Sequence, residues 1–142
     1  MKLHIFSRSD AVSFQPEQRT YAIRIFSSWN LPIERNPLRE SPLYLSVREY
    51  VFDDNDDFYQ AGPRTIDDTI AAEIVDDFAK GRGEAECLLV HCGRGINRAP
   101  AVALALNDIF HLGHDSRWLR DKYKVSNQYV YQALIEAAGR RS

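Results

Sequence analysis

The sequence predicts an α/β fold, with a single domain over residues 1–142 and a small, mostly parallel central sheet flanked by helices. Strand patterns come first and then alternate with helical patterns, which is typical of parallel sheets covered by helices. The run at residues 87–90 is apolar throughout, as expected for a strand buried on both faces. A length of 142 residues suits one domain, and 44% hydrophobic with 27% charged residues argues against a disordered chain.

Further strands are expected before the first helix, because short runs rich in β-branched and aromatic residues are bounded by turn residues. They cover residues 3–7, 21–27 and 43–52. Three prolines between the second and third of these runs predict a loop over residues 28–42. The third run leads into an acidic loop that begins at Asp53.

Four helices are predicted from the spacing of their apolar residues and from their end signals. The first is expected to begin at Ile66, because Thr65 and Asp68 resemble a capping box, and to end at Gly81. The others are expected over residues 99–112, 116–123 and 126–138. Ser126 is the expected N-cap of the last helix, which Gly139 is expected to end.

The charge of the chain is spread unevenly. The net charge of −2 excludes a strongly basic nucleic-acid-binding protein. Residues 53–86 carry three basic and eleven acidic side chains, net −8, whereas residues 87–142 carry eight basic and four acidic side chains, net +4. The near-neutral total therefore hides an acidic middle and a basic C-terminal half.

The sequence indicates a cytoplasmic protein with no membrane partner. No apolar run approaches the ~18 residues of a membrane span, and the N-terminus lacks the pattern of a signal peptide. The two cysteines, Cys87 and Cys92, are too few for a disulfide framework. Cys87 begins an apolar strand and is expected in the core, with a protective Cys87–Cys92 disulfide on oxidation as the alternative hypothesis.

The chemistry of the chain is concentrated where the apolar strand ends. His91 to Arg98 contain the pattern Cys-x5-Arg between a predicted strand and a predicted helix. The N–H groups of such a loop can form an anion nest, to which the helix adds the positive end of its dipole. Arg98 can offer a bidentate fork to phosphate oxygens. Cys92 at the base of this positive loop is expected to ionise to a thiolate, a nucleophile suited to in-line phosphoryl transfer.

The residues His91-Cys92-x-x-Gly95-x-x-Arg98 resemble the signature loop of the cysteine-dependent protein tyrosine phosphatases. The short chain looks most like the compact bacterial form of their dual-specificity branch, over residues 43–142. The resemblance implies that Cys92 forms a phosphocysteine intermediate and that Arg98 binds the phosphate and stabilises the transition state. It also implies that His91 orients the loop. The cradle of phosphate oxygens would be the backbone of Gly93, Arg94, Gly95, Ile96, Asn97 and Arg98.

The same resemblance implies a hydrolase that acts on phosphorylated proteins or small phosphomonoesters and needs no cofactor or metal. It requires a general acid on an upstream loop, to protonate the leaving oxygen. Asp54 is the favoured candidate, because its Phe-Asp-Asp context resembles the compact bacterial relatives. Asp57 and Asp53 are the alternatives.

Ala99 departs from the family pattern, which has serine or threonine directly after the arginine. That hydroxyl helps to break down the phosphoenzyme, so its absence predicts slow hydrolysis of the intermediate, or a phosphate-binding relative without turnover. A further alternative comes from Gly95-Ile96-Asn97-Arg98, which resembles the loop of the RNA 5′-triphosphatase branch. Arg94 would then add charge for the 5′ end of an RNA, a polyphosphate or an inositol phosphate.

Overall fold

The computed structural model describes residues 1–30, 35–54 and 65–141, and these residues form an α/β fold, as the sequence predicts. The strands are β1 (Lys2–Ser7), β2 (Thr20–Phe26), β3 (Tyr44–Val51) and β4 (Cys87–Cys92). The helices are α1 (Arg8–Ser13), α2 (Asp68–Gly81), α3 (Arg98–Phe110), α4 (Ser116–Lys122) and α5 (Gln128–Arg140). Among the described residues, no helix is long and apolar enough to cross a membrane.

The strands form one sheet in the order β1-β4-β2-β3. Every pairing is parallel, which confirms the expectation of a mostly parallel sheet. The two central strands, β4 and β2, are buried along their whole lengths. Because parallel strands end at the same edge of a sheet, the residues that follow β2, β3 and β4 are brought together there.

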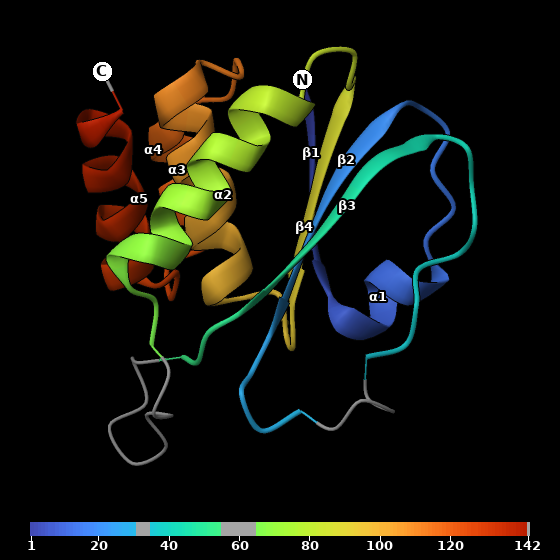
Figure 1. The fold of residues 1–142 in the computed structure, drawn as a ribbon, viewed down its shortest axis with the longest axis horizontal. Helices are drawn as coiled ribbons and strands as arrows, with labels where there is room; N and C mark the ends of the chain where they lie inside the picture. Colours follow the sequence, from blue (N-terminus) through green and yellow to red (C-terminus); the bar gives the residue numbers. More distant parts are fainter. Residues whose placement is uncertain (31–34, 55–64, 142) are drawn as a thin grey trace.

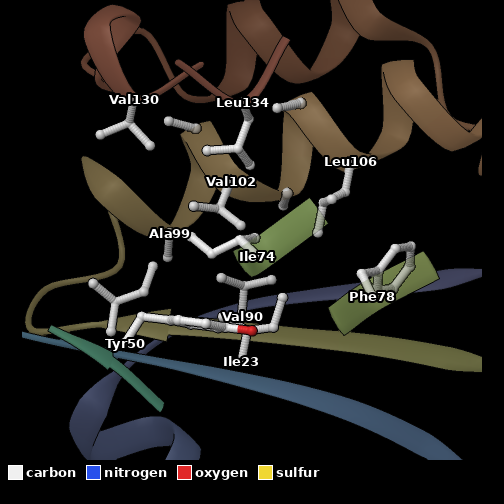
Figure 2. Close-up of a cluster of buried hydrophobic side chains, with 14 of the residues drawn as sticks. Ile23, Tyr50, Ile74, Phe78, Val90, Ala99, Val102, Leu106, Val130 and Leu134 are labelled. Atoms are coloured by element: carbon white, nitrogen blue, oxygen red, sulfur yellow. The ribbon is translucent and has the colours of Figure 1, made fainter. Parts of the chain in front are cut away.

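Helices cover both faces of the sheet (Figure 1). α2, α3, α4 and α5 lie on one face, which we call the helical face, and α1 lies on the other. Figure 2 shows Ile23 and Val90 of the sheet beneath Ile74, Val102 and Leu134 of the helices. Each of these five side chains is fully buried. Cys92 belongs to the same core cluster, and because side chains alternate along a strand, His91 points to the α1 face.

Helix α1 was not predicted from the sequence. It has only six residues, of which Ala11 is buried, so it shows no apolar periodicity. The Ser7 side chain caps it by accepting a hydrogen bond from the backbone N–H of Asp10, at 3.1 Å. Its first residue also supports the loop after β4, because the backbone N–H of Arg8 donates to the Gly93 carbonyl at 3.1 Å.

The predicted helix ends need correction at three places. Asp67, rather than Thr65, is the N-cap of α2, and its side chain accepts from the Ile70 N–H at 2.8 Å. Asn127, rather than Ser126, is the N-cap of α5. Gly139 lies inside α5 instead of ending it. Several residues with capping side chains stand next to one another at these ends, so local sequence does not determine which of them folds back on the helix.

Candidate active site

Strand β4 ends at Cys92, and α3 begins six residues later at Arg98, as the strand–loop–helix pattern predicts. The Cys92 side chain is 2% exposed. Its Sγ accepts hydrogen bonds from the backbone N–H groups of Gly95, at 3.3 Å, and Ala99, at 3.4 Å. The loop therefore curls around the sulfur and offers it two backbone donors.

Gly95 is the one position in this loop where glycine is required. Its φ of +78° lies in the left-handed region. A Cβ atom built there would lie 2.6 Å from the backbone carbon of Phe6 and 2.7 Å from the Ser7 nitrogen. The loop therefore packs directly against the end of β1, at a distance that no side chain allows.

The guanidinium of Arg98 is held from one side only. It is 7% exposed, and its Nη1 donates to Ser27 Oγ at 3.0 Å and to the Phe52 carbonyl at 2.8 Å. The Nε–H is buried and has no hydrogen-bond partner among the described residues. Nη2 lies beside Gly93, 3.9 Å from where a Cβ on that residue would stand. A buried donor without an acceptor is costly, and an oxyanion bound at the loop would supply one.

His91 is fully buried behind the loop. Its Nδ1 lies 3.4 Å from the carbonyl oxygen of Cys92, and its Nε2 accepts a hydrogen bond from Arg24 Nε at 2.9 Å. Burial, followed by the positive charge of Arg24, lowers the pKa of His91 to about 4. The imidazole is therefore neutral at physiological pH.

The candidate acids lie after β3 and differ in their surroundings. Both carboxylate oxygens of Asp53 accept hydrogen bonds from Ser28, one from its N–H at 2.7 Å and one from its hydroxyl at 2.6 Å. Asp53 is also 1% exposed, which favours an anchoring role. Asp54 is half-buried and directly follows this anchor. Asp57 lies outside the described residues.

The remaining loop residues divide into exposed and anchored ones. Gly93, Arg94 and Ile96 are exposed, so their outer faces are open to a ligand. Asn97 is tied to the segment before α5. Its Nδ2 donates to the Val125 carbonyl at 3.2 Å, and its Oδ1 accepts from Asn127 Nδ2 at 3.1 Å.

A disulfide between Cys87 and Cys92 is excluded by the fold. The two residues stand at opposite ends of β4. Five residues of extended strand span about 16 Å, whereas a disulfide needs Cα atoms about 4.4–6.8 Å apart. Cys87 is buried, as the core interpretation expects, and its Sγ lies 3.2 Å from Gln18 Oε1.

Sequence reasoning missed the residues that support the loop from other strands. Ser27 and Ser28 follow β2 and hold Arg98 and Asp53, but short serine pairs are common in loops and give no signal. Arg24 did carry a signal, because a charged residue in the middle of a strand that is otherwise apolar is rarely buried without a specific partner.

Comparison with solved structures finds the crystal structure of Tk-PTP in the active form, a protein tyrosine phosphatase. It is 14% identical to this chain, covers 100% of this chain and 94% of its own, and superposes with a TM-score of 0.50. Neither a protein-family model nor a curated protein sequence matches the chain. At this identity the likeness concerns the fold alone. The chain therefore has an α/β fold similar to that of a protein tyrosine phosphatase.

Proposed function

We propose that this protein hydrolyses phosphomonoesters through a phosphocysteine intermediate. The Cys92 thiolate attacks phosphorus, and the bond from phosphorus to the ester oxygen breaks as the leaving oxygen takes a proton from an aspartic acid. Water then attacks the phosphocysteine and gives its proton to the same aspartate. The bond from sulfur to phosphorus breaks, which releases inorganic phosphate and restores the thiolate.

The observation that carries this proposal is the contact between the Cys92 sulfur and backbone N–H groups of the loop that surrounds it. Two backbone N–H groups contact it, and Arg98 stands at the start of the following helix with a buried Nε–H that finds no acceptor in the described part of the chain. A phosphoryl group above the sulfur would accept hydrogen bonds from the guanidinium and from the loop backbone. Such fixed donors stabilise a transition state whose charge is spread over equatorial oxygens.

Asp54 is the proposed general acid. Ser28 holds both oxygens of the preceding residue, Asp53, so the start of the acidic loop is anchored to the end of β2. The Phe52 carbonyl, two residues before Asp54, accepts a hydrogen bond from Arg98. Asp54 therefore stands two residues after a carbonyl that binds the Arg98 guanidinium, and its side chain is partly exposed.

Phosphorylated proteins are the proposed substrates, with phosphotyrosine or mixed specificity. The alternative of an RNA 5′ end rested on Asn97 and Arg94. The Asn97 amide is occupied by Val125 and Asn127, so it gains no support as a substrate ligand. Arg94 is exposed, and its charge suits any phosphate-rich ligand.

The test is steady-state hydrolysis of an aryl phosphate. We expect Cys92→Ser to lose at least about a thousandfold in kcat, because the nucleophile is removed. Cys87→Ser is the matched control and should keep wild-type activity, since Cys87 lies at the far end of β4. Full activity of Cys92→Ser would overturn the proposal.

The acid is tested separately with Asp54→Asn, Asp57→Asn and Asp53→Asn. General acid catalysis contributes about 10²–10⁴-fold, so Asp54→Asn should fall by that factor on a substrate with a poor leaving group and much less on an activated one. If Asp57→Asn shows that leaving-group dependence instead, the acid assignment changes and the nucleophile stands. The substrate class is decided by comparing the rates of hydrolysis of a phosphotyrosine peptide and of triphosphate-ended RNA.

A further inference from the structure

Arg24 is a buried cation in the centre of the sheet, behind the Cys92 loop. It is 2% exposed and comes from the central strand β2. Nε donates to His91 Nε2 at 2.9 Å, Nη1 donates to Glu49 Oε2 at 3.4 Å, and Nη2 donates to the Asn36 carbonyl. A buried charge is costly to hold unless it is paired and hydrogen-bonded, so three directed contacts indicate a specific arrangement.

The contact with Arg24 decides which nitrogen of His91 carries the proton. A guanidinium has donors and no acceptor, so Nε2 of His91 must present its lone pair. A neutral imidazole has one N–H, which must then be on Nδ1. That N–H points at the carbonyl of Cys92, 3.4 Å away. Arg24 is therefore linked through His91 to the backbone of the proposed nucleophile.

The positive charges that face His91 all act in the same direction. Arg24 from β2, Arg8 from α1 and Arg98 from α3 all disfavour the imidazolium, in addition to burial. Glu49 from β3 offsets part of this field through its contact with Arg24. Protonated His91 would also place an N–H against the N–H of Arg24, so the geometry and the positive charges both disfavour the cation.

We propose that Arg24 is a positioning residue: it locks His91 in the neutral Nδ1–H form and thereby holds the carbonyl of Cys92 in the orientation that aims the sulfur into the loop. Its effect on turnover rests on the proposed phosphatase function, but its effect on His91 does not. Arg24 touches neither the sulfur nor the substrate site. It is fixed instead on the α1 face of the sheet, beside an open cavity of about 800 Å³ lined in part by Arg24, Tyr44 and Glu49.

The first test is nitrogen NMR of the His91 ring in the wild-type protein, assigned with His91→Gln. The expected spectrum shows one protonated nitrogen, Nδ1, from neutral pH down to about pH 4.5. In Arg24→Met the positive neighbour and the Nε donor are lost, so the pKa should rise from about 4, and both neutral tautomers should be populated. A wild-type spectrum of the Nε2–H form, or of the imidazolium at pH 6, would overturn the proposal whether or not the protein is a phosphatase.

The second test measures turnover of an aryl phosphate as a function of pH. Arg24→Met should lower kcat about tenfold with a smaller change in KM, since a slightly misplaced nucleophile slows the reaction without removing phosphate ligands. Its activity should also fall at a higher pH on the acid side than that of the wild type. Arg24→Lys keeps the charge without the directed Nε donor and should be similarly slow at neutral pH.

Arg19→Met is the matched control. Arg19 lies just before β2, and its guanidinium forms exposed ion pairs with Glu84 and Glu86 at the opposite edge of the sheet. This variant should leave both the His91 spectrum and the pH profile unchanged. Wild-type kinetics and an unchanged His91 spectrum in folded Arg24→Met or Arg24→Lys would refute the positioning role.

Chemical rescue separates positioning from general stability. In Arg24→Ala, the adjoining cavity gives a small guanidinium ion a path to the vacated space beside His91. Millimolar guanidinium should restore part of the lost kcat and the Nδ1–H signal, and an equal concentration of sodium ion should not. A loss of activity that only a stabilising osmolyte restores would assign Arg24 a purely structural role.

Discussion

The sulfur of Cys92 is held by backbone donors rather than by side chains. Gly95 and Ala99 both contribute N–H groups, and neither has a side chain that can hydrogen-bond. Ala99 is fully buried, and it carries no hydroxyl at the position where the phosphatases that this loop resembles have one. In the proposed mechanism, the departure of this sulfur from phosphorus would therefore receive no help from a hydroxyl at position 99.

Ala99→Ser should speed the breakdown of the phosphocysteine. In the wild type we expect a burst of about one equivalent of alcohol product followed by a slow phase, because dephosphorylation limits turnover. The serine should raise the rate of the slow phase about tenfold and leave the rate of the burst unchanged, as measured by rapid-quench kinetics. Ala99→Val, which adds bulk without a hydroxyl, is the control. Linear turnover of the wild type with no burst would contradict this expectation.

Gly95→Ala should destabilise the protein and abolish activity. The left-handed φ of +78° and the contact of 2.6 Å with Phe6 together should cost about 2–4 kcal/mol in the free energy of unfolding. Gly113→Ala is the matched control, since Gly113 has a φ of +99° but no atom within 4 Å of the added methyl group. It should lose only about 1–2 kcal/mol. If urea unfolding gave the two variants equal losses in the free energy of unfolding, the close packing of Gly95 against β1 would contribute nothing to stability.

At the scale of elements, the residue that caps α5 also supports the loop between β4 and α3. Asn127 is fully buried; its Oδ1 accepts from the Val130 N–H at 3.0 Å, and its own N–H donates to the Asn97 carbonyl at 3.0 Å. The sequence indicates a helix here but places the cap on Ser126. Asn127 rather than Ser126 contacts Asn97, which lies thirty residues earlier. No local sequence pattern shows this contact, so none could have identified the cap.

Asn127→Ala should therefore weaken both stability and activity. Loss of a cap and of a buried partner for Asn97 should cost about 2–3 kcal/mol. Asp115→Ala removes the cap of α4, which accepts from the Trp118 N–H at 3.0 Å but is exposed and does not touch the loop. That control should lose about 1 kcal/mol and no activity. Similar activity losses in the two variants would contradict the supporting role of α5.

At the scale of the whole molecule, the all-parallel sheet explains how distant residues meet. Ser27 follows β2, Phe52 follows β3, and Arg98 follows the loop after β4. All three strands end at one edge, so Ser27 and Arg98, 71 residues apart, form a hydrogen bond there. The same arrangement places a titratable group, His91, in the fully buried centre of the fold.

Burial of His91 should make the stability of the fold depend on pH. The folded pKa of about 4 lies below the ordinary value of 6.5, so the unfolded chain binds the proton more readily. Stability is therefore full above about pH 6.5 and falls between that pH and about pH 4, by about 2 kcal/mol at pH 5. Urea unfolding of His91→Gln should show a flatter dependence in this window. His4→Gln is the control, because the pKa of His4 is also lowered by burial but the ring is only partly buried.

The sequence by itself determined the order of the strands and of the helices other than α1, and the residues of the loop between β4 and α3. These follow from local patterns, since apolar spacing, turn residues and the Cys-x5-Arg spacing all lie within short segments. Only the tertiary structure decided which residues support that loop. Arg24 and His91 are 67 residues apart, and they meet because β2 and β4 pair in a parallel register that brings them side by side. Hydrogen bonds between distant segments depend on that register, and no spacing along the chain encodes it.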